Sequence, residues 1–97
     1  MAKIRLLPLT RTARIMLALQ IWSTTRRKWD NLLSDVPSVS FDELGVPFQY
    51  PLIMDLREQG ILHLTSTRDG SCGVALKRMY AELTMPEFHA EIKRLTP

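Results

Sequence analysis

The feature that most restricts this fold is the regular placement of helix caps, helix stops and turn residues near the middle of the chain. Ser40 and Glu43 form a capping box, in which the hydroxyl accepts a free backbone N–H and the carboxylate reaches back to the cap. A short helix is therefore expected from Phe41, and Gly45 suits its left-handed end. Pro47 then prevents the helix from continuing. The pattern predicts a short helix followed by a turn.

A second helix and a hairpin are expected directly after this turn. Pro51 suits the first turn of a helix, and the apolar residues that follow it lie on one side until Gly60. From Ile61 the pattern becomes that of a strand, and Asp69-Gly70 is typical of a hairpin turn. Residues 74–80 are expected to form the returning strand. This order predicts an α+β fold of the winged-helix type: a helix-turn-helix core, a C-terminal β-hairpin wing and a closing helix.

A long first helix is expected to pack under the pair. Ile15, Leu19 and Trp22 repeat at i, i+4 and i+7, with Met16 among the residues that widen the apolar stripe. Leu9 or Thr10 would stand at its start. The predicted connection to the short helix, residues 29–39, is rich in turn formers and has room for one helical turn, with its two leucines, Leu32 and Leu33, pinned to the core.

A last amphipathic helix is expected to close the domain. Thr84 and Glu87 form a second capping box, and Phe88, Ile92 and Leu95 follow at helical spacing. With 97 residues, 45% of them hydrophobic, the chain can bury one core, so residues 1–97 are predicted to be a single domain. The single cysteine excludes an internal disulfide, and no apolar run reaches the length of about 20 residues that a membrane helix needs. These features predict a soluble intracellular protein.

Charge is distributed unevenly along the chain. Residues 1–29 hold seven Lys and Arg and no acid, whereas residues 30–97 hold six bases and ten acids, which together give the net charge of +3. Clustered bases attract phosphate and make binding depend on salt. The alternative for such a cluster is a solvated face or an arm that improves solubility.

Nine residues are predicted to contact DNA. Arg57 is the one base of the second helix, against Asp55 and Glu58, so weak sequence-specific readout is expected from that helix. The wing and its end are better placed to contact the DNA backbone or a minor groove. For Tyr50 a core or turn role is an open alternative, and Arg68 can equally belong to a soluble turn. The predicted contacts are Arg26, Arg27, Lys28, Gln49, Tyr50, Arg57, Arg68, Lys77 and Arg78.

No enzymatic site is expected. His63, His89 and Cys72 lack the spacing of a metal site or of a nucleophile with its base, so neither catalysis nor a cofactor is predicted. The five methionines are interpreted as core residues. Trp29, which follows three consecutive bases, is interpreted as a core anchor, with stacking on a nucleic-acid base as the alternative.

The order of elements resembles the C-terminal winged-helix domain of replication initiators in the origin recognition complex and of their licensing-factor relatives. The residues that carry this resemblance are the expected strand 74–80, the link Ala81-Glu82-Leu83 and the helix that begins at Thr84. In that family these domains contact origin DNA and neighbouring subunits, while a separate AAA+ module handles ATP. No GxxxxGK[ST] motif occurs here, so the resemblance implies a domain cut from a larger protein, in the nucleus or in a prokaryotic cytoplasm.

Three functions follow from these expectations. The first is a DNA-binding winged helix that holds duplex DNA mainly by its phosphates, in origin recognition or initiator loading. The second is a protein-interaction winged helix in a multisubunit nuclear assembly, and the third is a small transcriptional regulator that dimerises through its first or last helix. The expected partners are duplex DNA and other subunits of such an assembly, with neither a membrane nor a small-molecule substrate.

Overall fold

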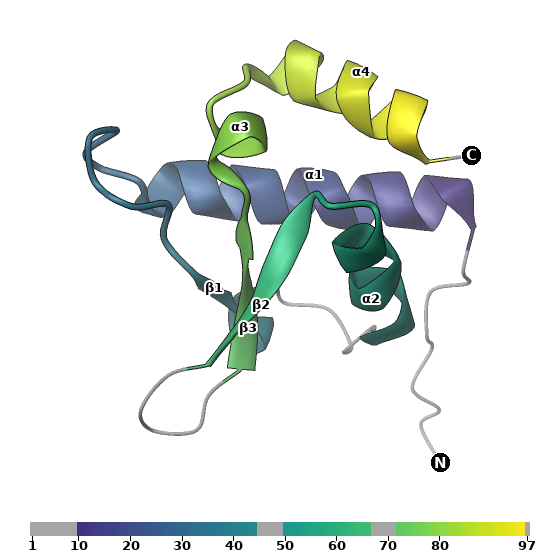
Figure 1. Ribbon diagram of the computed structural model, residues 1–97, viewed down its shortest axis with the longest axis horizontal. Helices are drawn as coiled ribbons and strands as arrows, with labels where there is room; N and C mark the ends of the chain where they lie inside the picture. The colour runs from purple at the N-terminus through teal and green to yellow at the C-terminus, as the bar shows by residue number, and fades with distance from the viewer. Residues whose placement is uncertain (1–9, 45–49, 67–71, 97) are drawn as a thin grey trace.

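The computed structural model describes residues 10–44, 50–66 and 72–96. In chain order its elements are α1 (Arg11–Lys28), β1 (Val39–Ser40), the 3-10 helix η1 (Phe41–Leu44), α2 (Tyr50–Glu58), β2 (Leu62–Ser66), β3 (Cys72–Leu76), α3 (Arg78–Ala81) and α4 (Met85–Leu95) (Figure 1). The predicted α+β class is confirmed. Within the described ranges no helix is long and apolar enough to span a membrane.

Helix α1 is the central element, with α4 on one side and α2 and the sheet on the other (Figure 1). It begins after Thr10, whose side chain accepts a hydrogen bond from the backbone N–H of Ala13 at 3.0 Å, as predicted for one of the two candidate caps. Because neighbours cover it on two sides, buried residues occur around much of its circumference. Met16, however, is 59% exposed, so its predicted place in the apolar stripe is wrong.

The three strands form an antiparallel sheet in the order β1-β3-β2. The hairpin of β2 and β3 was predicted, whereas the two-residue strand β1 was not. Val39 of β1 and Leu64 of β2 pair with Val74 of the central strand from opposite sides. Gly73 permits the close approach of β1, because a Cβ at this position would lie 2.4 Å from the carbonyl oxygen of Val39.

Helix α2 ends where the sequence predicts, although it begins one residue earlier than Pro51. Gly60 has a φ of 78°, a conformation in which an L side chain is strained. The next residue, Ile61, is fully buried and donates its N–H to the carbonyl of Leu56 at 3.2 Å. Leu52, Ile53 and Leu56 face the core. The predicted turn before α2 lies at residues 45–49, outside the described part of the chain.

The predicted strand over residues 74–80 is too long. Strand β3 ends at Leu76, which pairs with Leu62, the first residue of β2, and the last bond along this edge runs from the N–H of Lys77 to the carbonyl of Ile61 at 3.0 Å. The chain turns instead into α3, where the N–H groups of Tyr80 and Ala81 bond to the carbonyl of Lys77. Lys77 and Arg78 therefore stand at the start of a helical turn rather than at the end of the wing.

Helix α4 follows the predicted capping box. The Thr84 side chain accepts from the Glu87 N–H at 3.4 Å, and Glu87 accepts from the Thr84 N–H at 2.9 Å. Phe88 and Ile92 are fully buried, and the Phe88 ring stacks on Trp22 with centroids 6.2 Å apart. The closing helix is thus joined to the same core as the sheet and α2.

The connection between α1 and β1 departs from prediction at its two leucines. Trp29 is buried, as predicted for a core anchor, but Leu32 and Leu33 are 52% and 91% exposed. Hydrogen bonds, rather than apolar packing, stabilise this turn. The side-chain oxygen of Asn31 accepts from the N–H of Leu33, and the backbone carbonyl of Asn31 accepts from the N–H of Ser34, both at 2.9 Å. The core prediction for the methionines is wrong for Met79 and Met85 as well, which are 66% and 40% exposed.

Candidate interaction surfaces

Two predicted DNA contacts, Arg26 and Arg78, lie on the same tryptophan. Their guanidinium carbons are 6.0 and 5.5 Å from the centroid of the Trp29 ring, within the range of a cation–π contact. Arg26 also lies 5.4 Å from the Trp22 ring centroid and donates to the carbonyl of Ala81 at 2.8 Å. Arg26 is half-buried and joins α1 to α3. It is therefore poorly placed to hold phosphate.

Arg78 is exposed, yet the chain's own acceptors surround its guanidinium. It donates to the Glu82 carboxylate at 2.6 Å, to the carbonyl of Ser34 at 3.2 Å and to the carbonyl of Leu32. These bonds tie the turn after α1 to α3. Arg78 would have to give up part of this set to contact DNA.

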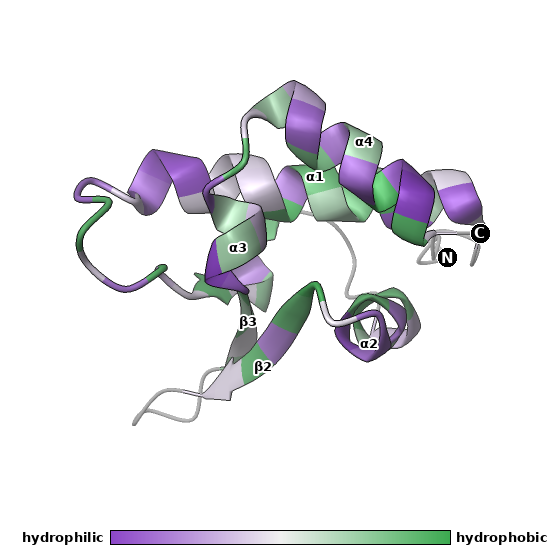
Figure 2. Ribbon diagram, turned by 45° about the horizontal axis from the view of Figure 1, so that its top comes forward, coloured by the Kyte–Doolittle hydropathy of each residue, from purple (hydrophilic) through white to green (hydrophobic). Residues whose placement is uncertain are grey.

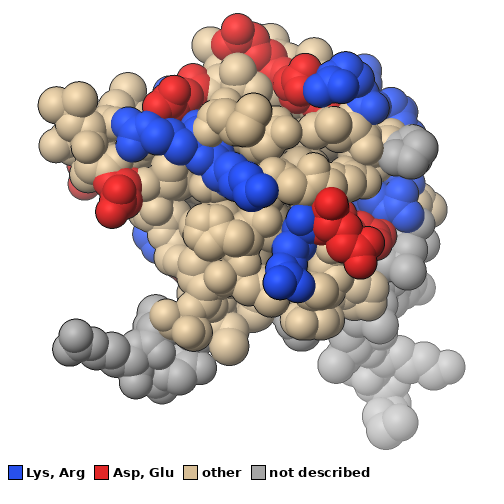
Figure 3. All heavy atoms as spheres, viewed as in Figure 1, with Lys and Arg blue, Asp and Glu red and all other residues tan. Residues whose placement is uncertain are grey.

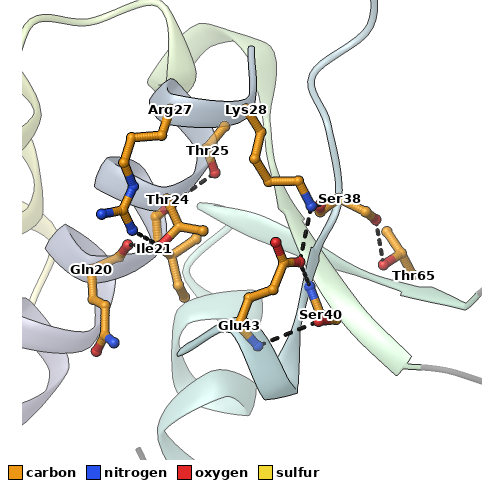
Figure 4. Close-up of polar contacts among 10 residues, drawn as sticks. All are labelled: Gln20, Ile21, Thr24, Thr25, Arg27, Lys28, Ser38, Ser40, Glu43 and Thr65. Carbon is orange, nitrogen blue, oxygen red and sulfur yellow. Dashed lines mark hydrogen bonds and ion pairs between the residues drawn. The ribbon is translucent and has the colours of Figure 1, made fainter. Parts of the chain in front are cut away.

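Lys28 is likewise engaged within the chain. Its ammonium donates to the carbonyl of Ser38 at 2.8 Å and to the carboxylate of Glu43 at 2.9 Å (Figure 4). Glu43 also accepts from the N–H of Ser40 at 2.8 Å, which confirms the predicted capping box. The hydrogen bond from Lys28, followed by that from the Ser40 backbone, lowers the pKa of the Glu43 carboxyl. This network joins the end of α1 to η1.

The remaining predicted cations of the described residues are Arg27, Arg57 and Lys77. Arg27 is exposed and donates to the Thr24 hydroxyl at 3.2 Å, leaving the end of α1 in a different direction from Lys28 (Figure 4). Arg57 is exposed near the end of α2. Lys77 is also exposed, and its Nζ lies 3.6 Å from where a Cβ of Gly60 would be, close to the C-terminal end of α2. An ammonium there complements the helix dipole.

Three predicted contacts remain, Gln49, Tyr50 and Arg68, and the structure describes only Tyr50. Tyr50 is 44% exposed and begins α2, where it lines a hollow of about 150 Å³ together with Phe41 and Cys72. Gln49 and Arg68 lie outside the described residues. The face shown in Figure 3 carries Lys and Arg in separate spots with Asp and Glu among them, so it presents no continuous basic surface over the described residues.

A different surface gathers exposed apolar side chains. A groove of about 420 Å³ lies beside α3 and α4, lined by Met79, Tyr80, Leu83, Glu87 and Glu91. We call it the α3–α4 groove. The exposed pair Leu32–Leu33, which we call the leucine turn, stands in the connection after α1, and Arg78 of α3 donates to the backbone carbonyls of Leu32 and Ser34 there. Figure 2 shows hydrophobic residues in green on this connection.

This apolar surface was not predicted from the sequence. One signal was present: two adjacent leucines stand among turn formers, with Asn31 before them and Ser34 after them. Such a turn can hold its backbone by polar contacts and leave both apolar side chains outside. A second hollow, of about 450 Å³, is lined mainly by charged and polar residues, among them Asp35, His63, Lys77 and Arg78.

The described residues include no group of three or more His, Cys, Asp and Glu that could hold a metal ion. Comparison of the chain with protein-family models, curated proteins and solved structures found no match.

Proposed function

We propose that this chain is a winged-helix module whose main task is to bind another protein within a multisubunit assembly. The winged-helix assignment is supported by the order α1, η1, α2 and hairpin, and by the pairing of β1 with β3, which holds the hairpin to the rest of the domain. The assembly that the sequence resemblance suggests is a replication-initiation complex.

The observation that carries the protein-binding function is the exposed apolar surface of the leucine turn and the α3–α4 groove. Leu33 is 91% exposed and Met79 is 66% exposed, so neither side chain is part of the core. Burying one such side chain is worth about 1.5–3 kcal/mol. Exposed apolar side chains, and a groove whose apolar walls have a polar rim, are typical of protein contacts.

The hydrogen bonds of three predicted DNA-contacting cations favour the same conclusion. A surface that binds DNA by charge needs cations whose hydrogen bonds are free for phosphate. Arg26, Lys28 and Arg78 are instead used to fix α3, η1 and the leucine turn. These three cations of the described residues therefore stabilise the fold through their hydrogen bonds.

The test is site-specific crosslinking in the cells that produce the chain. A photo-crosslinking amino acid is placed at Leu33 or Met79, and at the exposed Thr12 as a matched control, because Thr12 lies near the other end of α1. We expect one defined adduct from Leu33 and Met79 and none from Thr12. Equal yields at all three positions, or no adduct at Leu33 and Met79, would contradict the function.

A second candidate, duplex DNA binding in origin recognition or initiator loading, is favoured by the exposure of Arg27, Arg57 and Lys77. Arg68 belongs to the same proposal. Binding of a labelled random duplex is measured across a salt series for the native chain and for the triple Ala variant of the three exposed bases. We expect the log–log slope to become shallower by about 0.9 for each phosphate that the variant no longer neutralises.

The control for this experiment is Lys93→Ala, which removes an exposed base of α4 outside the predicted DNA contacts. An equal change in slope in Lys93→Ala and in the triple variant would indicate that net charge alone governs binding. Absence of binding even at low salt would exclude the DNA function for this chain.

A further inference from the structure

The α3–α4 groove is lined by two chemically different sets of residues. Met79 and Tyr80 of α3, with Leu83 of the link to α4, form the apolar set, and the acids Glu87 and Glu91 of α4 form the other. We infer that the partner of this groove is a protein segment that carries lysine or arginine beside apolar side chains. This inference rests on the proposed protein-binding function and names the chemistry of the partner at the same surface.

The apolar set is accessible and its backbone is held in place. Met79 is 66% exposed, whereas Tyr80 and Leu83 are half-buried and pack against the core. The carbonyl of Leu83 accepts from the ring N–H of Trp22 at 3.2 Å, and its N–H donates to the carbonyl of Tyr80 at 3.2 Å. Because these bonds already fix the link, little conformational entropy is lost when a guest covers it. An apolar guest side chain would remove the exposed surface of Met79 from water.

The two acids of the groove are charged neighbours on one face of α4. Glu87 and Glu91 are four residues apart in this helix, so their side chains lie one turn from each other. The hydrogen bond from the Thr84 backbone lowers the pKa of the Glu87 carboxyl, and the hydrogen bond from Arg94 lowers that of Glu91. Both groups are therefore carboxylates at neutral pH. The groove presents two negative charges to a guest.

Both carboxylates have room for a further hydrogen-bond donor. A carboxylate offers about four lone-pair sites on its two oxygens. One oxygen of Glu87 accepts from the Thr84 N–H at 2.9 Å, and Arg94 donates to the two oxygens of Glu91 at 3.2 and 2.7 Å. A lysine or arginine of the guest can thus donate to the same carboxylates without displacing these donors. The Arg94 side chain is 65% exposed, so solvent and salt screen its repulsion of the guest.

The same charges disfavour other occupants of the groove. Figure 3 shows acidic atoms over the beginning of α4, at the top of this view, and basic atoms toward its end. DNA or an acidic segment would bring further negative charge toward Glu87 and Glu91, which weakens binding. A wholly apolar segment would take water from both carboxylates and offer no donor in return. A segment with an apolar side chain against Met79 and cations against the two acids avoids both costs.

The test is the binding of two labelled peptides to the whole chain, measured by fluorescence anisotropy at low and high NaCl. Both peptides have about 15 residues, mostly alanine, with leucines along one side of a helix. One carries lysine at i and i+4 beside the leucines, and its twin carries glutamate there. We expect the native chain to bind the lysine peptide at least about tenfold more tightly, and NaCl to reduce this preference. Equal affinities, or no binding of the lysine peptide at low NaCl, would overturn the inference.

Substitutions in the groove assign the preference to its residues. Glu87→Gln combined with Glu91→Gln removes both charges, and Gln at the first position can still accept the Thr84 N–H. This double variant should bind the lysine peptide about tenfold more weakly, whereas Met79→Gln should weaken both peptides by a similar factor. The matched control Glu58→Gln removes an exposed acid of α2, across α1 from α4, and should change neither affinity. Circular dichroism shows whether each variant is folded, and an equal loss in the control would overturn the inference.

The crosslink at Met79 separates a failure of this inference from a failure of the proposed function. Mass spectrometry of the adduct identifies the partner segment, which should contain lysine or arginine next to apolar residues. An adduct at Met79 with an acidic or uncharged segment would overturn the basic partner alone. Absence of adducts at both Met79 and Leu33 would overturn the proposed function as well.

Discussion

The absence of a side chain at Gly73 allows β1 to lie close to the central strand. A Cβ there would lie 2.4 Å from the carbonyl oxygen of Val39 and 3.0 Å from the Cα of Ser40, and both are backbone atoms that move only with β1. Gly73→Ala should therefore reduce the free energy of unfolding by about 1–3 kcal/mol, as overpacking does. Urea denaturation measures this loss.

The matched control is Gly60→Asn. At Gly60 the added Cβ would meet only the flexible Nζ of Lys77 at 3.6 Å, and Asn tolerates positive φ better than other L residues. We expect it to change stability less than Gly73→Ala does. A Gly73→Ala variant as stable as the native chain would contradict the close packing of β1.

Glu43 predicts a dependence of stability on pH. Its carboxyl pKa is lowered in the folded state by the hydrogen bond from Lys28 and by that from the Ser40 backbone, so the stabilisation is present above the ordinary value of about 4.3 and is lost as pH falls through the folded value. Glu43→Gln should cost about 1 kcal/mol or less at pH 7, since the pair is partly exposed. Denaturation curves of the two proteins should converge as the pH falls below the lowered pKa of Glu43, and a constant difference would contradict this role.

Single residues also show the limit of prediction from this sequence. The bases Arg26, Lys28 and Arg78 were identified as candidate contacts because of their charge, but what each does depends on partners distant in the chain. The acceptors of Arg26 and Arg78 lie 55 and 46 residues away. No local pattern reveals such partners. The sequence alone therefore does not distinguish a base that is hydrogen-bonded within the chain from a base that is available to bind phosphate.

At the scale of elements, local chemistry predicted the fold where the interacting groups are close in sequence. Thr84 and Glu87 are three residues apart, and Gly60 ends α2 through its own backbone conformation. Strand β1 and helix α3 were missed because their bounds depend on tertiary pairing: β1 needs β3, and α3 begins where the pairing of β3 with the β2 segment ends. Patterns of apolar residues do not contain this information.

The capping box of α4 carries a prediction at this scale. Thr84→Ala removes the acceptor for the Glu87 N–H and leaves one helix donor without its cap, which should cost about 1 kcal/mol. Thermal denaturation and amide exchange of the first turn of α4 measure the effect. Thr84→Ser keeps the hydroxyl and should restore most of the stability; equal losses for Ala and Ser would show that the cap contributes little.

At the scale of the whole molecule, α1 lies between α4 on one side and α2 with the sheet on the other (Figure 1). Phe88 of α4 packs on one side of α1 and Ile53 of α2 on the other, and both belong to a single buried cluster. The described residues therefore predict one cooperative unit. The single domain over residues 1–97 stays a prediction.

Substitutions on the two sides of α1 test this unity. Phe88→Ala and Ile53→Ala both empty fully or almost fully buried positions, and each should lower the free energy of unfolding by about 2–5 kcal/mol. Tryptophan fluorescence reports on Trp22, which stacks on Phe88, and on the buried Trp29 just after α1, whereas far-UV circular dichroism reports on all helices and strands. In a single cooperative unit the two signals must change together in both variants, whichever side is weakened. If Phe88→Ala separates an early fluorescence transition from a later loss of circular dichroism, α4 unfolds on its own, and the α3–α4 groove then belongs to an element that can detach from the sheet and α2.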